Sequence, residues 1–186
     1  MEIDNVLGNL VRAVQILEDC EEFSDLIPEV RVNLVMALPD AKSEKDVAAI
    51  PGRITKVFRR PVAVGQPALG GSSHMARVVL QVMKHDPSMR AAMNIKYDDE
   101  IIRILREEGL NPVVIDRKEE PPEIKMQEGK TSGWLVEKAS GEAGGLPGAI
   151  CDKGDFGKEP LILLIGRNAV EVAQKATKIA KRYGGK

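Results

Sequence analysis

The sequence predicts an α/β fold in one layered domain, and three observations support this expectation. Segments with apolar residues at helical spacing alternate along the chain with segments whose apolar residues recur with a period of two. The length of 186 residues suits one domain, and no internal repeat divides it. With 43% hydrophobic residues but only 3 Phe, 2 Tyr and 1 Trp, the expected core is mainly aliphatic. We therefore expect residues 1–186 to form a single domain.

The first half of the chain is predicted to begin with a helix and continue with strands. Apolar residues at helical spacing behind an Asp start signal predict a helix over residues 4–22. Alternation with a period of two then predicts a strand over 30–38, which Pro39 ends. The polar stretch 41–52 is expected to be a loop with a short turn. Short strands are predicted over 53–58 and 62–64, as a hairpin or a bent strand.

The second half is predicted to alternate helices and strands. Glycine and other small residues mark 65–73 as a flexible loop that leads into a helix ending at Lys84. The remaining expected elements are a short helical piece from Pro87, a strand over 93–97, a helix over 98–108 capped by Gly109, a strand over 112–116, a solvated segment over 117–129, a helix capped by Ser132, an apolar segment over 149–151, a loop over 152–160, a strand over 161–165 and a helix over 168–183.

Composition excludes several classes of function. Lys and Arg number 27 against 28 Asp and Glu, so the net charge of −1 provides no global field that would attract nucleic acid. The start of the chain lacks a basic segment followed by an apolar one, and no stretch is apolar enough to cross a membrane. The 2 cysteines are far apart and form no disulfide framework. We expect a cytoplasmic protein that binds neither nucleic acid nor membranes.

The chain has 2 histidines, His74 and His85, which is too few for a zinc site of three histidines. His85 stands at a predicted helix end and is expected to cap it rather than to bind a ligand. A nucleophilic pair of Cys20 or Cys151 with His74 stays open, although no motif around either cysteine would activate its thiol.

A glycine loop followed by a helix predicts an anion site. In the segment from Gly70 to Arg77, free backbone N–H groups and the positive end of the helix dipole point at the loop. Ser72 or Ser73 would cap the helix, His74 would lie in its first turn, and Arg77 would share the face of His74. The alternative is a purely structural loop. The segment does not form a nucleotide-binding Walker loop, because Gly71 occupies the lysine position.

A second candidate site is the segment from Gly154 to Pro160. Its glycines allow a close backbone approach, and Lys158 supplies a point charge that suits phosphate. Asp152 and Asp155 would suit a hydrated Mg²⁺, which prefers one or two carboxylates. A solvent-exposed turn is the competing interpretation. Asp116 and Arg117 form a third, less specific candidate at the end of a predicted strand, where open α/β sheets often bind ligands.

Five blocks of sequence together lead to a family resemblance. They are PEVRVNLVMALP at 28–39, DVAAIPGRI at 46–54, GSSHMAR at 71–77, RAAMNIKY at 90–97 and GDFGKEP at 154–160. In this order they resemble the archaeal ThiN-type thiamine-phosphate synthase domain, over about residues 1–180. The resemblance implies a three-layer α/β/α fold with a mixed sheet, similar to the class II aldolase-like superfamily but without that group's histidine-bound metal.

The resemblance also implies a reaction and its site residues. Hydroxymethylpyrimidine diphosphate and hydroxyethylthiazole phosphate, the small-molecule partners, would combine to thiamine phosphate and pyrophosphate. Arg53 and His74 match the arginine and histidine of the family's active-site motifs. We expect Arg53 to bind the diphosphate or the thiazole phosphate, and His74 to hydrogen-bond to or protonate the leaving group. The expected substrate-binding residues are Gly71, Ser72, Ser73, Arg77, Asn94, Asp116, Arg117, Asp155, Gly157 and Lys158, and Mg²⁺ is a candidate cofactor.

Other functions stay open at this point. In the family this domain often follows a pyrimidine-phosphate kinase domain or a DNA-binding domain, and a sensor that binds thiamine phosphate without turnover is the alternative function. The presence of both Arg53 and His74 favours catalysis, because a sensor needs no group that assists a leaving group. An aldolase-like enzyme is disfavoured, since no metal set and no well-placed Schiff-base lysine stand out. Assembly of the chain into a homo-oligomer also stays open.

Overall fold

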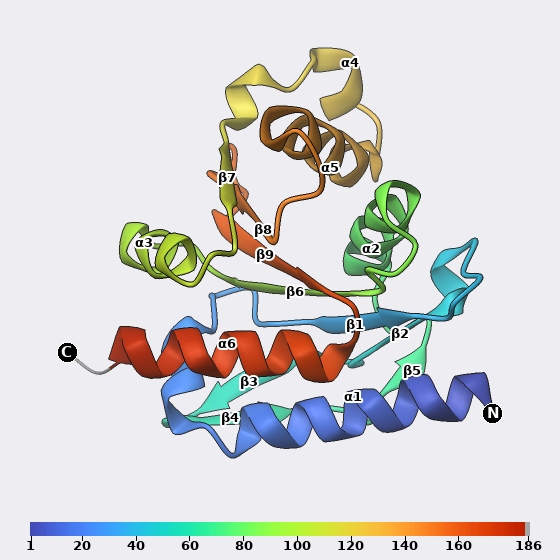
Figure 1. Cartoon of the computed structure of the whole chain (residues 1–186), viewed down its shortest axis with the longest axis vertical. Helices are drawn as coiled ribbons and strands as arrows, with labels where there is room; N and C mark the ends of the chain where they lie inside the picture. The colour runs from blue at the N-terminus through green and yellow to red at the C-terminus, as the bar shows by residue number, and fades with distance from the viewer. Residues whose placement is uncertain (185–186) are drawn as a thin grey trace.

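A seven-stranded mixed sheet in the order β5-β2-β1-β6-β9-β8-β7 runs through the computed structural model, which describes residues 1–184 (Figure 1). Its neighbouring strands are antiparallel except for β7 and β8, which are parallel. The strands are β1 (Leu34–Ala37), β2 (Val47–Ala49), β5 (Ala68–Leu69), β6 (Ala91–Lys96), β7 (Pro112–Ile115), β8 (Ala149–Asp152) and β9 (Leu161–Gly166). A separate hairpin consists of β3 (Ile54–Val57) and β4 (Arg60–Ala63), as the sequence predicted.

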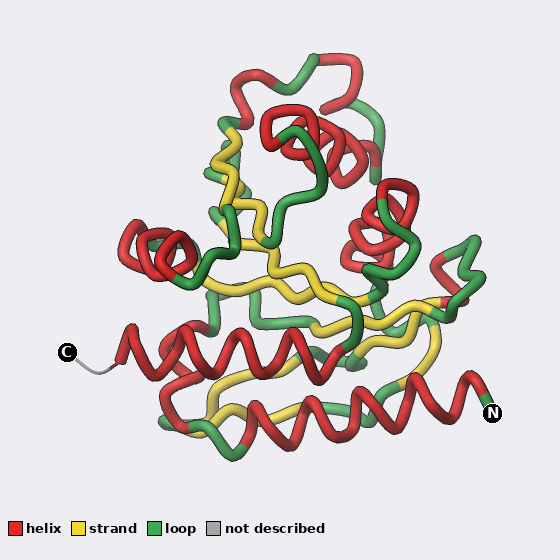
Figure 2. Tube along the Cα trace, viewed as in Figure 1, coloured by secondary structure: helices red, strands yellow, loops and turns green. Residues whose placement is uncertain are grey.

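Helices cover both faces of this sheet, which confirms the predicted three-layer α/β/α arrangement (Figure 2). On one face α1 (Glu2–Glu18) packs against α6 (Ala169–Gly184), and α3 (Asp99–Glu107) packs beside α6. On the other face α2 (Ser73–His85) packs against α5 (Lys130–Ala143). The short elements are η1 (Glu21–Leu26), η2 (Glu44–Asp46), η3 (Arg117–Glu119) and α4 (Pro122–Lys125).

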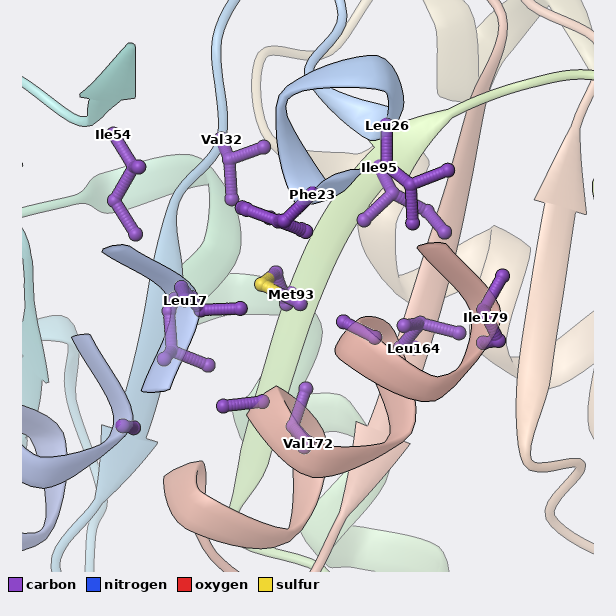
Figure 3. Packing of buried hydrophobic residues seen from close by; sticks show 14 of the residues in the cluster. Leu17, Phe23, Leu26, Val32, Ile54, Met93, Ile95, Leu164, Val172 and Ile179 are labelled. Carbon is purple, nitrogen blue, oxygen red and sulfur yellow. The ribbon is translucent and has the colours of Figure 1, made fainter. Parts of the chain in front are cut away.

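Two aliphatic cores form because the central strands are buried on both faces. Leu34 and Met36 of β1 face the core under α1 and α6, whereas Val35 and Ala37 face the core under α2 and α5. Figure 3 shows part of the first core, where Met93 of the sheet lies near Leu17, Leu164 and Val172. Burying one such aliphatic side chain contributes about 1.5–3 kcal/mol, so the two cores suffice to hold the helical layers.

Two predictions in the first half of the chain were wrong in detail. The stretch 41–52 is not only a loop, because Val47–Ala49 is a fully buried strand that pairs with β1 and β5. The strand predicted over 30–38 covers only Leu34–Ala37, since Arg31 has a φ of 68° and Val32 forms an isolated bridge with Ile54. The backbone before β1 is therefore irregular, and it lies beside the cavity described below.

Two predictions in the second half were also wrong. The residues from Pro87 form a turn rather than a helical piece, with the N–H of Met89 bonded to the carbonyl of Asp86. Ser132 does not cap α5, because the helix begins at Lys130 after Gly129, whose φ is 78°, and Ser132 is buried within it. Helix α5 therefore begins earlier in the chain than the sequence indicated.

The two cysteines, Cys20 and Cys151, are free and buried. Burial raises the pKa of the Cys151 thiol to about 12, so this thiol stays protonated at neutral pH. A cysteine nucleophile therefore has no support. Within residues 1–184, no helix is long and apolar enough to cross a membrane.

Candidate active site

A cavity of about 430 Å³ lies beside the starts of α2 and α5 and the loop between β8 and β9. A second hollow of about 670 Å³ adjoins it and shares Arg53, Ser72 and His74 with it. Most of the predicted site residues line one or both spaces: Arg53, Gly71, Ser72, Ser73, His74, Arg77, Asn94, Arg117, Gly157 and Lys158. The structure therefore brings together groups from the first two candidate segments and from the strand end at Arg117.

The start of α2 offers backbone donors to the cavity. Ser72 is the N-cap in extended conformation, but its side chain makes no capping hydrogen bond, so the first-turn N–H groups have no side-chain acceptor there. A Cβ on Gly71 would lie 3.1 Å from the carbonyl oxygen of Ala49, which explains why a glycine precedes the cap. The side chain of Ser73 bonds instead to Glu44, and hydrogen bonds from Ser73 and Arg77 lower the pKa of Glu44.

His74 lies in the first turn of α2, where its ring faces both spaces. Desolvation among the cavity walls lowers the pKa of His74, as do the cations of Arg77, Arg53 and Arg117, while Asp152 opposes the shift. No hydrogen-bond or ion-pair partner of this ring occurs within residues 1–184. The ring is therefore neutral at pH 7 and keeps one N–H donor for a ligand.

Arg53 precedes β3 and is held in a left-handed conformation with a φ of 69°. Its N–H bonds to the carbonyl of Ile50, and its own carbonyl accepts from the N–H of Val64. The guanidinium Nη1 donates to the carbonyl oxygen of Val30, which leaves the other guanidinium donors for a ligand. This backbone conformation costs free energy in a non-glycine residue, so the surrounding bonds must maintain it.

Glu159 fixes the segment that holds Arg53. Its two carboxylate oxygens accept hydrogen bonds from the N–H groups of Glu29 and Val30, at 2.9 and 3.0 Å. The carbonyl of Val30 is in turn the acceptor for Arg53. Glu159 therefore connects the loop between β8 and β9 to the predicted catalytic arginine, a role that the sequence analysis missed.

Arg77 lies one turn after His74 and contributes to the same cavity wall. Its Nε is 2.6 Å from Oε1 of Glu44, and its guanidinium packs on the backbone of Gly129. A Cβ at Gly129 would lie 2.7 Å from Nη1 of Arg77. The start of α5 thus needs glycine for its positive φ and for the close approach of this arginine.

A buried ionic cluster contributes Arg117, Asp152 and Thr131 to the cavity lining, and we call this part of the lining the floor. Arg117, 3% exposed, donates to Oδ2 of Asp152 at 3.0 Å and to Oε2 of Glu120 at 2.8 Å. Thr131 donates to the second oxygen of Glu120 at 2.6 Å. Burial raises the pKa of Asp152, while the N–H of Gly154 and the charge of Arg117 act in the opposite direction. Glu120 and Thr131 were not predicted as site residues.

Asn94 lies in the cavity wall, but both of its polar atoms have partners within the protein. Its Oδ1 accepts from the N–H of Asn33, and its Nδ2 donates to the carbonyl of Arg31. Asn33 in turn bonds to both backbone groups of Ile50. These amides stabilise the irregular backbone before β1, so a ligand contact of Asn94 stays a prediction.

Two predicted site residues are not brought into the cavity. Asp116 caps η3 by accepting from the N–H of Lys118 at 2.9 Å. Asp155 pairs with Lys125 of α4 at 2.8 Å. By contrast, Gly157, with a φ of 69°, and the exposed Lys158 contribute to the cavity wall. The predicted turn thus directs its lysine, rather than its aspartate, to the site.

The carboxylates suggested for Mg²⁺ do not fit a protein-held ion. Asp152 pairs with Arg117 and Asp155 pairs with Lys125, so a divalent cation at either carboxylate would lie against a fixed positive charge. Within residues 1–184, no group of three or more His, Cys, Asp or Glu side chains is arranged to hold a metal ion.

Several cavity residues were missed because they lie at the end of the segment 117–129, which was interpreted as solvated, or directly after it. Glu128, Gly129 and Thr131 line the cavity at the start of α5. The signal that could have found them is the Gly129 position before a helix, which resembles the glycine loop before α2.

This fold and this cavity define an α/β domain with a cavity of small-molecule size that several cations line, and comparisons with known proteins specify its family. The model of the family "Thiamine-phosphate synthase ThiN" matches residues 9–178. The thiamine-phosphate synthase ThiN of Methanothermobacter thermautotrophicus is 44% identical over 98% of this chain and 94% of its own length. The chain therefore belongs to the ThiN thiamine-phosphate synthase family, and the predicted enzyme class, a transferase, is confirmed.

Further comparisons agree with this assignment. The bifunctional thiamine biosynthesis protein ThiDN of Methanocaldococcus jannaschii is 40% identical over 97% of this chain, which matches 42% of that longer protein. A crystal structure of the C-terminal domain of phosphomethylpyrimidine kinase superposes with a TM-score of 0.90 at 42% identity, covering 96% of this chain and all of that one. YgbL of Escherichia coli, described as a putative aldolase, epimerase or decarboxylase, has a TM-score of 0.51 at 12% identity over 96% of this chain and 89% of that one. This last likeness concerns the fold alone and agrees with the predicted class II aldolase-like architecture.

Proposed function

We propose that this chain joins hydroxymethylpyrimidine diphosphate to hydroxyethylthiazole phosphate, which gives thiamine phosphate and pyrophosphate. The observation that carries the proposal is the meeting of Arg53 and His74 at the start of α2, in a cavity that also contains Arg77 and Lys158. The relatives named for this synthesis support the reaction. The cavity supports the class of substrate, because its cations and N–H donors suit phosphate groups.

The chemistry requires stabilisation of a leaving anion more than it requires a base. The bond between the pyrimidine methylene carbon and the diphosphate oxygen breaks, and its electron pair leaves with the diphosphate. The lone pair of the thiazole nitrogen forms the new C–N bond, and the product ring becomes a cation. Charge therefore builds on the diphosphate in the transition state, and donors aimed at that position lower the barrier.

The structure suggests how each group acts in this reaction. The free donors of Arg53 and the N–H groups at the start of α2 are placed to bind phosphate oxygens beside His74. His74, whose lowered pKa makes it neutral in the ligand-free cavity, is placed to donate a hydrogen bond to the leaving diphosphate. Arg77 and Lys158, which line the same cavity, supply charge for the second phosphate group of the diphosphate.

A coupled assay of pyrophosphate release with both substrates tests the proposal. Wild-type protein should release pyrophosphate and form thiamine phosphate only when both substrates are present. Arg53→Ala should lower kcat/KM about 100-fold or more, the magnitude for loss of a transition-state donor. Arg59→Ala is the matched control, because Arg59 is an exposed hairpin arginine that pairs with Glu21. Binding of thiamine phosphate without turnover would instead support the sensor function.

Two further points remain predictions that simple measurements test. Titration of Mg²⁺ into chelator-treated enzyme shows whether the reaction needs the ion. Asp155→Asn should leave any such requirement unchanged, because Asp155 pairs with Lys125 outside the cavity. Light scattering of the purified chain measures whether it forms a homo-oligomer.

A further inference from the structure

The cavity lining combines several cations with one buried carboxylate. Arg53, Arg77 and Lys158 line it, and the floor adds Asp152 beside Arg117. In the floor cluster, two buried carboxylates share the single guanidinium of Arg117. Of these two carboxylates, Asp152 lines the cavity and Glu120 does not. The floor therefore presents an acceptor to a ligand whose anionic part is bound by the walls.

Asp152 retains unused acceptor capacity. Oδ1 accepts one bond, from the N–H of Gly154 at 2.9 Å, and Oδ2 accepts one bond, from Arg117 at 3.0 Å. Each carboxylate oxygen can accept a second bond. Because Asp152 is only 8% exposed, solvent satisfies this capacity poorly, and a donor on a bound ligand would satisfy it well.

The proposed substrate has two matching ends, and the following step rests on the proposed function. Its diphosphate carries the negative charge, and its pyrimidine ring carries an exocyclic amino group, which donates hydrogen bonds. We infer that Asp152 accepts a hydrogen bond from this amino group, with the pyrimidine ring at the cavity floor and the diphosphate directed toward the start of α2. Asp152 is thus the residue that determines specificity for an aminopyrimidine.

Two other carboxylates line the cavity. Glu159 is only partly buried, and its two oxygens hold the N–H groups of Glu29 and Val30. Glu128 is also less suited to this role. It is exposed to solvent, and it precedes the start of α5 rather than forming part of the floor. Water therefore competes for its oxygens, and its contribution to discrimination between ligands is small. The buried position of Asp152 makes the loss of a donor costly, which is the condition for strong selectivity.

Equilibrium binding of thiamine phosphate and of its 4-oxo analogue tests this assignment without turnover. In the analogue a carbonyl oxygen replaces the amino group, so an acceptor would face the carboxylate of Asp152. Calorimetry of the wild-type protein should show a preference for thiamine phosphate of about tenfold or more. In Asp152→Asn the amide can donate to the carbonyl, so the preference should fall close to one or reverse.

Glu120→Gln is the matched control, because it removes one charge from the same cluster without changing a cavity-lining residue. It should keep the wild-type preference, even if both variants are less stable. A wild-type protein without preference, or Asp152→Asn with the full preference, would overturn the assignment, and the wild-type result requires no variant. Turnover without this preference leaves the proposed function intact and refutes the role of Asp152. The preference without turnover refutes the proposed function and retains the role of Asp152.

Discussion

The two histidines of the chain lie at opposite ends of helix α2, and their surroundings differ. His74 in the first turn of α2 faces the cavity, and its ring has no bonding partner within residues 1–184. His85 is the last residue of α2, and its Nε2 lies 3.1 Å from Oε1 of Glu137 on α5. The C-terminal end is thus tied to a neighbouring helix, while the N-terminal end keeps donors available.

The backbone shows the same difference between the two ends. At the C-terminal end, the N–H of Asp86 bonds to the carbonyl of Val82, and the Asp86 side chain accepts from Ser88. At the N-terminal end, Ser72 provides no capping bond. A helix that is secured at one end can hold unsatisfied donors rigidly at the other, which is the preorganisation that binding of an anion requires.

The largest expected difference in kcat/KM is that between the variants His74→Ala and His85→Ala. His74→Ala should lower kcat/KM about 100-fold or more, because a donor to the leaving group is lost. His85→Ala should leave kcat/KM within about twofold, since it removes only a partly exposed pair at the distant end. Steady-state pyrophosphate release measures both. Similar losses in the two variants would show that the ends of α2 do not differ in function.

A smaller effect is expected from the glycine that packs on Arg77. Gly129→Ala places a methyl group against the guanidinium at a φ of 78°, so KM for the pyrimidine substrate should rise several-fold as Arg77 moves. The free energy of unfolding should fall by about 1–2 kcal/mol.

Gly144 provides the matched control for this substitution. It ends α5 with a φ of 69° and has no atom within 4 Å of an added Cβ. Gly144→Ala should therefore lower the free energy of unfolding by about 1 kcal/mol through its backbone conformation alone, and KM should not change. Urea unfolding and substrate titration measure both quantities. An unchanged KM in Gly129→Ala would mean that the position of Arg77 does not matter for binding.

The two glutamates that pair with residues of α2 permit a milder comparison. Glu44→Gln weakens the hold on Arg77 and removes the charge beside Ser73, so KM for the diphosphate substrate should change by about two- to fivefold, roughly the effect of a partly exposed pair. Glu137→Gln makes the same chemical change beside His85 and should leave KM unaltered. Initial rates over a range of substrate concentrations distinguish the two. A larger change of KM in Glu137→Gln than in Glu44→Gln would contradict this prediction.

The smallest expected effect concerns pH. The pKa of His74 is lowered in the folded chain, so just below pH 6.5 the unfolded chain binds a proton that the folded chain does not. Stability should therefore decrease as the pH falls from about 6.5 toward the folded pKa, and His74→Gln should reduce that decrease. Titration of the imidazole by NMR should give a midpoint below about 6.5 for His74. A midpoint above that value would contradict the neutral-donor role.

The fold was predictable where periodicity is strong, and less so where a strand is short. The helices of both layers carry clear apolar stripes, and β9 is a run of Leu and Ile that sequence alone identifies. Strand β2 was missed because Val47, Ala48 and Ala49 are small residues inside a polar stretch, and their pairing with β1 and β5 is non-local. Tertiary pairing, rather than local preference, determines this strand.

The site was predictable as far as its residues stand in local motifs. Arg53, Ser72 and His74 meet in the cavity, as the glycine loop and the family resemblance led us to expect. The sequence did not allow us to predict the partners of the aspartates, since Asp155 pairs with Lys125 from a distant segment. The hydrogen bonds from the backbone N–H groups of residues 29 and 30 to Glu159 likewise join segments about 130 positions apart. Such pairings arise only when the chain is folded.

The burial of both native cysteines has a practical consequence for following the loop beside the cavity. Cys20 and Cys151 are inside the protein, and burial raises the pKa of each thiol, so neither reacts readily with alkylating probes. Phe156, at the tip of that loop, is fully exposed. A cysteine introduced there by Phe156→Cys can carry a fluorophore selectively in the native background. The signal of that label then measures whether the loop responds when a phosphorylated ligand is added.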